Sequence, residues 1–333
     1  MESDIRLGNV SDNMVLGDYY LDLSNTIKLV NSGYYGQIDD NGVPLVDYDK
    51  LFKNSRIIDR KDTYGIHYTP VTIAQYGLGL YSSHLKKPDS EYYRLFLAQA
   101  DWHVDNILPA HGNCAVWLHN FEFPMYKLHY SWVSAMAQGQ GISLLLRAYQ
   151  ATNDQRYLET AYRAYKTFNR DIWTGGVSYV DKHGNLWLEE YPTSPACHVL
   201  NGFIFAIWGV LDYYRATNDS AAGNLYKQCI KTMRENINNY EGLYWSKYDA
   251  LTQENVSLDY HMLHVMQLQV LAQLTRDTIL SETAGRWAGY VAGKHKVARF
   301  AYRFTRGVMR RLGFCEKVSV KGVSFNSKMG SSL

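Results

Sequence analysis

The chain has 333 residues, of which 46% are hydrophobic and 20% are charged, and its formal net charge is +2. This composition can fill a large core and excludes a mostly disordered protein, while the balance of charges gives no basis for binding nucleic acid. The four cysteines lie far apart and include no CxxC pair, which favours a reducing compartment over a disulfide scaffold.

The first 23 residues contain five carboxylates and no apolar core, a pattern unlike a signal peptide. No run approaches the ~18 apolar residues of a membrane span. We therefore expect a soluble, cytoplasmic protein. Residues 1–66 hold Asx and glycine turns, such as Asp39-Asp40-Asn41-Gly42, between short apolar runs, and they predict an extended, partly β cap.

A short internal repeat follows. Ala151-Thr152-Asn153-Asp154 recurs as Ala216-Thr217-Asn218-Asp219, with Leu274-Thr275-Arg276-Asp277 and Lys86-Lys87-Pro88-Asp89 in the corresponding places. Around each copy, apolar residues have the i, i+3, i+4, i+7 spacing of amphipathic helices. This pattern predicts four helical hairpins, at residues 70–107, 131–171, 195–237 and 257–293. Because such hairpins bury their apolar stripes by curling together, we expect a mainly α fold, an incomplete (α/α) toroid over residues 67–293.

Long links, at residues 108–130, 172–194 and 238–256, join successive hairpins and are expected to reach one rim of the toroid. The helices that begin there direct free N–H groups and positive dipole ends toward the rim, which favours an anionic ligand. Within the second link, residues 177–180 and 186–188 flank a polar turn and predict an inserted β-hairpin. Ser194-Pro195 predicts the N-cap and first turn of the next helix.

The segment from Trp187 to Thr193 places two carboxylates and a phenol side by side before a helix start. A strict strand would put Glu190 and Tyr191 on opposite faces, although Pro192 ends the strand and can turn its last residues. We favour Glu190 over Glu189 as the functional carboxylate. An isolated acidic pair is usually solvated surface, whereas convergence from separate repeats favours a site. The converging residues are Tyr130, Glu189, Glu190, Tyr191, Tyr248, Asp259, Tyr260 and His261.

His261 and His264 share a helix face near Asp259, which allows a zinc-site interpretation, but no third ligand at metal-site spacing is evident. A hydrogen bond from either histidine to the rim or to a substrate carboxylate is the alternative that we favour. His198 and Asn201 fit either a buried polar pair or a substrate contact. Common nucleotide, hydrolase and metalloprotease motifs are absent, and we expect no cofactor and no metal.

Several motifs, in the same order along the chain, resemble the C-terminal domain of the heparan sulfate/heparosan D-glucuronyl C5-epimerases. They are residues 70–78, 134–140, 187–193, 199–203, 259–261 and 267–269, and the resemblance covers roughly residues 66–293. It implies an α/α toroid that converts D-glucuronic acid to L-iduronic acid units within an anionic uronic-acid polysaccharide. Animal members carry a larger β region before the helical domain, so the first 66 residues predict a reduced one.

The resemblance also implies site residues. The second glutamate of the EEYPT motif matches Glu190, the tyrosine beside it Tyr191, and the tyrosine of the DYH motif Tyr260. A further family tyrosine in the third link matches Tyr248, with Tyr244 as the competing alignment. The residues expected to contact substrate are Tyr130, Trp132, Gln138, Glu189, Asn201, Asp259 and His261.

Inversion at C5 requires one group to remove the proton and another to return it from the opposite face. We expect Glu190 or Tyr260 to take the proton and Tyr248 or Tyr191 to return one. Because a phenol has a reference pKa of ~10, a tyrosine base would need cationic neighbours, and a tyrosine donor would not. Three alternatives stay open: a uronate polysaccharide lyase, a noncatalytic uronate-polymer binding module, and a toroid glycosidase that uses Glu190 and Asp259.

Residues 294–312 alternate basic and apolar side chains and predict a basic amphipathic helix. It either contacts a membrane surface or a synthase complex, or packs on the toroid as a solvated helix. Peripheral attachment at the inner face of a membrane is therefore a further expectation, and a homodimer is compatible with the sequence. Residues 315–333 are expected to be loose.

Overall fold

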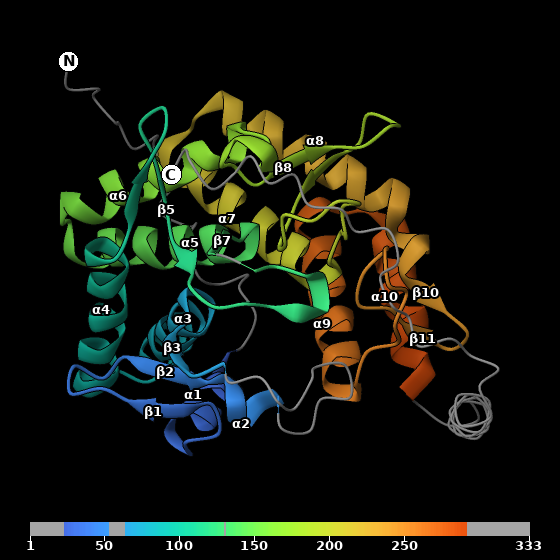
Figure 1. The fold of residues 1–333 in the computed structure, drawn as a ribbon. Coiled ribbons are helices and arrows are strands. Elements are labelled where there is room, and N and C mark those ends of the chain that lie inside the picture. Colours follow the sequence, from blue (N-terminus) through green and yellow to red (C-terminus); the bar gives the residue numbers. More distant parts are fainter. Residues whose placement is uncertain (1–22, 53–63, 130, 292–333) are drawn as a thin grey trace.

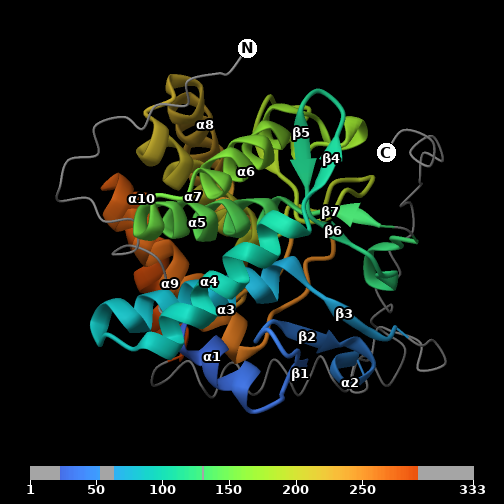
Figure 2. The same cartoon turned by 90° about the vertical axis from the view of Figure 1, so that its left-hand side faces the viewer.

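The computed structural model describes residues 23–52, 64–129 and 131–291. Its main feature is the set of four helical hairpins that the repeat predicts, arranged as an incomplete toroid (Figures 1 and 2). The first helices of the hairpins are α3 (Pro70–Lys86), α5 (Ala135–Thr152), α7 (Leu200–Thr217) and α9 (Leu258–Thr275). The second helices are α4 (Ser90–Asp105), α6 (Gln155–Tyr165), α8 (Ser220–Asn236) and α10 (Thr278–Val291). The mainly α fold is therefore confirmed.

Tyr130, the basic segment 294–312 and the tail 315–333, for which the sequence makes predictions, lie outside the described residues. Within the described ranges, no helix has both the length and the apolar character needed to cross a membrane.

The repeated motif builds the turn inside the hairpins. At the end of the first helix, a threonine donates to the carbonyl four residues back and accepts from the amide of the following aspartate. The residue between them has left-handed backbone, with φ of 56° to 61°, and the aspartate then caps the second helix by accepting an amide of its first turn. Each N-cap of this kind contributes ~1 kcal/mol. The three copies are Thr152-Asn153-Asp154, Thr217-Asn218-Asp219 and Thr275-Arg276-Asp277.

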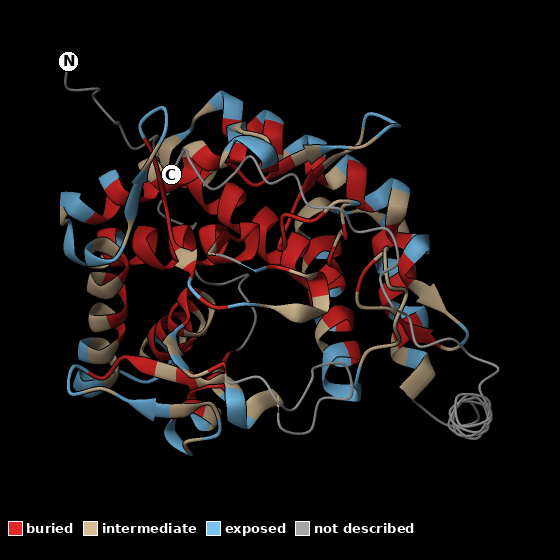
Figure 3. Cartoon of the chain, viewed as in Figure 1, coloured by how far each residue is buried: buried red, intermediate tan, exposed pale blue. Residues whose placement is uncertain are grey.

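Glycines allow α5 and α7 to approach closely. A Cβ placed on Gly209 would lie 2.3 Å from the Cα of Gly139, and one placed on Gly139 would lie 2.7 Å from the Cα of Ala206. Both helices are buried along nearly their whole length, as Figure 3 shows. Contact between the two backbones therefore sets the spacing at the centre of the toroid.

The substitution Gly209→Ala is expected to destabilise the protein by about 3 kcal/mol, because the added methyl group meets a backbone that has no room to yield. Urea unfolding followed by circular dichroism measures this change. Gly285→Ala is the matched control, since nothing lies within 4 Å of its added Cβ. There the higher helix propensity of alanine should stabilise by about 0.5–1 kcal/mol. Equal effects of the two substitutions would contradict the close approach.

The N-terminal cap, residues 23–68, contains more helix than the sequence predicts. A three-stranded antiparallel sheet of β1 (Gly36–Ile38), β2 (Pro44–Asp47) and β3 (Ile66–Tyr68) is joined by α1 (Ser24–Asn31) and the short α2 (Tyr48–Phe52). The sheet agrees with the predicted extended, partly β cap. The helix α1, which buries Ile27 and Val30 in the main core of the toroid, was not predicted.

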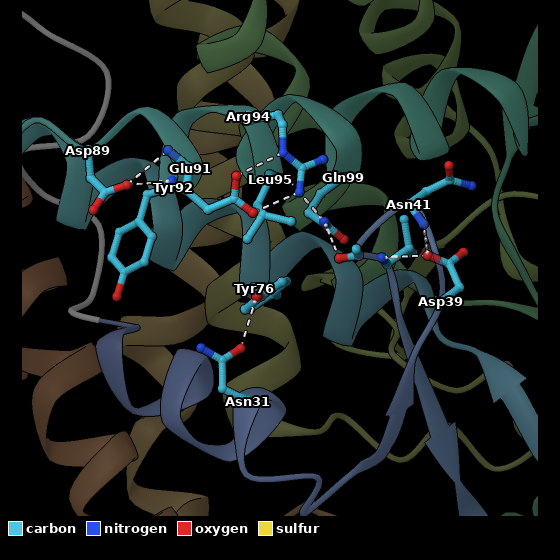
Figure 4. A network of polar contacts seen from close by, with 12 residues as sticks. Asn31, Asp39, Asn41, Tyr76, Asp89, Glu91, Tyr92, Arg94, Leu95 and Gln99 are labelled. Atoms are coloured by element: carbon cyan, nitrogen blue, oxygen red, sulfur yellow. Dashed lines mark hydrogen bonds and ion pairs between the residues drawn. The ribbon is translucent and has the colours of Figure 1, made fainter.

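Polar contacts also hold the N-terminal cap against α3 and α4 (Figure 4). The Tyr76 hydroxyl donates to Asn31 Oδ1 at 3.0 Å, and the buried Gln99 amide donates to the carbonyl of Gly42 at 2.9 Å. In both views of the fold the three-stranded sheet lies below α5 and α6, at the bottom of the picture (Figures 1 and 2).

The links between hairpins contain short antiparallel strands, and these strands position the side chains of the links. The predicted β-hairpin is confirmed as β8 (Ser178–Val180) and β9 (Leu186–Leu188), and the first link forms β4 (Leu108–Ala110), β5 (Cys114–Val116), β6 (Leu118–His119) and β7 (Trp132–Val133). The third link contains β10 (Glu241–Gly242) and β11 (Trp245–Ser246).

The predicted start of α7 at Ser194-Pro195 is wrong, since the helix begins at Leu200. The preceding residues pair with the third link instead. The Ala250 amide donates to the Cys197 carbonyl at 3.0 Å, and Val199 forms a β-bridge with Asp249. These tertiary contacts keep residues 194–199 out of the helix, despite a local sequence pattern that is typical of a helix start.

Candidate active site

A second, smaller hydrophobic core lies between the links. We call its four rings, Phe121, Tyr126, Trp132 and Tyr191, the aromatic cluster. The Tyr191 ring contacts Tyr126 at 4.5 Å and Trp132 at 5.2 Å between ring centroids. Two links therefore meet around Tyr191, and Glu190 precedes it directly.

Main-chain bonds on both sides of Glu189 position Glu190. The Glu189 amide donates to the Val177 carbonyl at 2.8 Å, and the Glu189 carbonyl accepts from the Ala135 amide at 2.9 Å. The Glu190 carboxyl packs against Gly202 in the first turn of α7, where an added Cβ would lie 2.2 Å from Glu190 Oε2. Only glycine leaves room for the carboxyl group in this position.

The Glu190 carboxyl is 8% exposed, and its Oε2 atom has no hydrogen-bond partner. Its pKa is raised to about 7, chiefly by burial and also by the nearby Glu189 and Asp249 carboxyls, against a hydrogen bond with Tyr191 that lowers it. A carboxyl with a pKa near neutrality can accept a proton and release it again at physiological pH.

The raised pKa predicts a pH-dependent cost to folding. Between pH 4.5 and 7 the unfolded chain loses this proton while the folded protein keeps it, so the contribution of Glu190 to stability falls as pH rises through that window. At about 1.4 kcal/mol per pH unit, Glu190→Gln should be more stable than the wild type by about 3 kcal/mol at pH 8 and should lose that advantage at pH 4.5. Urea unfolding at both pH values measures the difference.

The matched control is Glu122→Gln, which removes a carboxyl that is 63% exposed. Its effect should stay within about 0.5 kcal/mol at both pH values. A stability gain in Glu190→Gln that is the same at both pH values would contradict the buried, proton-binding carboxyl.

Glu189 is 1% exposed and is bonded to His198. Its Oε1 lies 2.5 Å from His198 Nδ1, and its Oε2 accepts from the His198 amide at 3.0 Å. These contacts indicate a structural role for Glu189 and His198, because they tie the second link to the segment just before α7. The expected conflict between Glu190 and Tyr191 does not arise, because β9 ends at Leu188 and leaves both residues outside the strand.

The third link brings Tyr248 to the same place. The Leu200 amide donates to the Tyr248 carbonyl at 3.1 Å, and Tyr126 donates to the buried carboxylate of Asp249 at 2.5 Å. The Tyr248 hydroxyl then lies 3.4 Å from the Tyr191 hydroxyl. Tyr244, the competing candidate, packs instead on Tyr290, with 5.8 Å between ring centroids.

Tyr260, in the first turn of α9, completes the group. Its ring meets the Tyr248 ring edge-on at 5.8 Å, and it is 44% exposed. Desolvation raises the pKa of both Tyr248 and Tyr260, and the Glu190 carboxyl raises each further. With these pKa values both phenols are neutral at physiological pH, so they are suited to donate protons.

The other predicted contacts have different surroundings. Trp132 belongs to the aromatic cluster, Asn201 is buried with its Oδ1 atom unpaired, and Asp259 is exposed in the first turn of α9. Gln138 is fully buried, accepts from the Trp117 amide and donates to the Ala115 carbonyl. Its side-chain amide is therefore bonded within the core, in contrast to the predicted contact with substrate.

His261 is also buried away from substrate. Its Nδ1 lies 2.8 Å from Ser246 Oγ, and its Nε2 lies 3.0 Å from the Trp287 carbonyl. The same serine contacts His264 Nδ1 at 3.0 Å, so the two histidines share a hydroxyl. In the part of the chain that the structure describes, no three His, Cys, Asp or Glu side chains form a metal-binding group.

Sequence reasoning missed Tyr48, Phe121 and Tyr126. Tyr48 comes from the N-terminal cap, and its ring lies 4.1 Å from Phe121. No local pattern marks these residues, because their proximity to Glu190 arises from contacts between distant segments. Asp249, the neighbour of Tyr248, anchors the third link by accepting hydrogen bonds from Tyr126 and Thr252.

Fold and site together define a helical toroid in which a buried carboxyl and several phenols, drawn from different links, gather beside the start of α7. The model of one protein family, described as D-glucuronyl C5-epimerase C-terminus, matches residues 111–289, more than half of the chain. The chain belongs to this family.

Two relatives support the assignment. A D-glucuronyl C5-epimerase of Caenorhabditis elegans is 35% identical over 222 residues, which are 61% of this chain and 36% of that protein. An uncharacterized protein of Methanocaldococcus jannaschii is 32% identical over 194 residues, which are 57% of this chain and 63% of that protein. The chain thus spans less than two thirds of the length of either relative.

A solved structure of UGL with dGlcA-Glc-Rha-Glc is 14% identical and covers 84% of this chain and 74% of that chain. Its TM-score of 0.45 is too low to support an argument about fold or function.

Proposed function

We propose that the protein is a polysaccharide uronate C5-epimerase that converts D-glucuronic acid to L-iduronic acid units in a heparosan-like polymer. The observation that carries this proposal is the meeting of Glu190, Tyr248 and Tyr260, which come from the second link, the third link and α9. Family membership supports the class of reaction, and the C. elegans relative carries this activity in its name.

In the proposed reaction, the Glu190 carboxylate takes the proton from C5, and the electrons of the C5–H bond move into the sugar carboxylate. Tyr248 then donates its hydroxyl proton to C5 from the opposite face, which leaves a phenolate. The Tyr191 hydroxyl, 3.4 Å away, can share that charge through a hydrogen bond. Solvent finally returns a proton to the phenol and removes one from Glu190.

The assignment of base and acid follows from the pKa values. Glu190, with a pKa of about 7, is ionised in a large fraction of molecules at neutral pH. Desolvation raises the pKa of Tyr191, Tyr248 and Tyr260, Glu190 and neighbouring phenols add to the increase, and the three phenols therefore hold their protons. This favours Glu190 as base and Tyr248 as donor over the reverse roles.

The polymer substrate carries carboxylates, and the helix starts offer a place for them. α7 and α9 both begin beside the tyrosines, at Leu200 and Leu258. Amide groups and dipoles at such starts stabilise negative charge, including the charge that builds up as the C5 proton leaves. An anionic uronic-acid polysaccharide is therefore the partner that we propose.

A lyase begins with the same proton abstraction and then expels the 4-linked sugar. Incubation with a glucuronate polymer separates the two reactions. An epimerase leaves the chain length unchanged on size exclusion and creates no ultraviolet-absorbing product, whereas an unsaturated uronate with shortened chains would establish a lyase. Binding of the polymer without any chemical change would support a noncatalytic module.

A further inference from the structure

The N-terminal cap brings a set of phenols to one end of its sheet. Tyr35 precedes β1 and Tyr48 follows β2, and the Asp47 amide donates to the Tyr35 carbonyl at 2.7 Å, so the two tyrosines lie at the same end of the β1–β2 pair. Tyr34 packs edge-on against Tyr35 at 5.3 Å. We call Tyr34, Tyr35 and Tyr48 the cap tyrosines. They lie outside the matched family region, residues 111–289.

Ring contacts connect this end of the sheet to the candidate active site. The Tyr48 ring lies 4.1 Å from Phe121, which lies 5.8 Å from Trp132, and Trp132 in turn contacts Tyr191 at 5.2 Å. The Tyr48 hydroxyl is 3.2 Å from Thr69 Oγ1, at the residue before α3. The N-terminal cap is therefore packed onto the same cluster that holds the residue next to Glu190.

Electrostatic interactions agree with this geometry. The pKa of Tyr48 is raised to about 12, chiefly by burial and also by the Glu190 carboxyl and Tyr35, against a hydrogen bond with Thr69 that lowers it. Desolvation raises the pKa of Tyr260, and Glu190 and all three cap tyrosines add to that increase. Tyr48 therefore interacts electrostatically with Glu190, and all three cap tyrosines interact with Tyr260.

One cap tyrosine and one phenol of the candidate active site are open to a ligand. Tyr34 is 52% exposed and Tyr260 is 44% exposed. Neutral phenols near a carboxyl are poor partners for another anion, but they can donate to and accept from hydroxyl groups, and their rings pack on the C–H faces of sugars. The chemistry fits an uncharged part of a sugar chain.

We propose that the cap tyrosines form a second sugar-binding subsite, which holds the neutral sugar next to the reacting uronate through its hydroxyl groups. This inference rests on the proposed epimerase function. The N-terminal cap then contributes to polymer binding and not to proton transfer. Its contribution should appear in KM and leave kcat unchanged.

The test compares Tyr34→Ala and Tyr48→Phe with the wild type on two substrates, a heparosan polymer and methyl β-D-glucuronide, which has no neighbouring sugar. Exchange of the C5 hydrogen is followed by NMR in heavy water. For the polymer, Tyr34→Ala should raise KM about fivefold to tenfold, as expected for a lost ring contact or hydrogen bond. Tyr48→Phe loses the contact with Thr69 that positions the cap and should raise KM by a smaller factor, about twofold to threefold. The kcat on the polymer and the rate on the glucuronide should stay within about twofold of wild type.

Tyr244→Phe is the control, because Tyr244 packs on Tyr290. It should leave both constants unchanged, and thermal unfolding should show all variants folded. An unchanged KM in both cap variants, or a fall in kcat with KM constant, would overturn the subsite.

The failure of the proposed function has a different signature, namely no exchange in the wild type on either substrate. In that case calorimetry with the polymer still tests the subsite. A fall in affinity of about fivefold in Tyr34→Ala would support the subsite, and equal affinities would overturn it.

Discussion

Glu190→Gln is expected to reduce the exchange of the C5 hydrogen by at least about a thousandfold, because the variant keeps the shape of the side chain but cannot accept a proton. The exchange rate of a glucuronate polymer in heavy water, measured by NMR, gives this value. In the wild type the rate should rise with pH until Glu190 is ionised, at about pH 7, and then level off. The rate rises with pH, and does not fall, because only the ionised Glu190 carboxylate can accept the C5 proton.

Glu122→Gln serves as the matched control for this prediction, since it removes an exposed carboxyl from the first link. It should exchange at the wild-type rate. If Glu190→Gln exchanges within about tenfold of the wild type while remaining folded, Glu190 is not the base and the assignment of the site is wrong.

Tyr248→Phe is expected to separate exchange from inversion. With Glu190 intact, the C5 proton still leaves and can be replaced by deuterium on the same face, so labelled glucuronate should form. Without the hydroxyl on the opposite face, the yield of iduronate should fall by about a hundredfold. Two signals in one NMR spectrum, deuterium at C5 of glucuronate and the appearance of iduronate, report the two steps.

Tyr244→Phe controls for the loss of a tyrosine hydroxyl in the same link and should leave both signals unchanged. Tyr191→Phe tests the neighbouring phenol and should cause a smaller loss, because it acts through its contact with Tyr248. Equal loss of exchange and inversion in Tyr248→Phe would contradict its role as the donor alone.

Much of the fold follows from local sequence. The repeat, Thr-Asn-Asp in two copies and Thr-Arg-Asp in the third, carries both the end of one helix and the cap of the next, so its copies place three of the four hairpin turns directly. Because the links between successive hairpins all lie at one end of the toroid, the hairpin pattern also predicts that Glu190, Tyr248 and Tyr260 converge. In the structure, these three residues lie close together because the links and the start of α9 share one end of the toroid.

Other features depend on contacts that no local pattern reveals. Ser194-Pro195 has the pattern of a helix start, but pairing of residues 197–200 with the third link delays α7 to Leu200. Gln138 and His261 lie in motifs that resemble the family, yet both are buried and bonded within the protein. A motif alone does not distinguish a residue that holds the site from one that touches substrate.

The contribution of the N-terminal cap was the least accessible to prediction. Tyr48 is more than 100 residues from Glu190 in sequence, and its position depends on the packing of α2 against the first link. Likewise, α1 was missed because its short apolar face becomes evident only once it packs into the main core.

The most direct test of the central claim is the NMR spectrum of a D-glucuronate polymer after incubation with the wild-type protein in heavy water. A carboxylate and a phenol acting on opposite faces of one sugar predict iduronate that carries deuterium at C5, in chains of unchanged length. Iduronate that retains the original hydrogen at C5, or no change at C5 at all, would contradict this account.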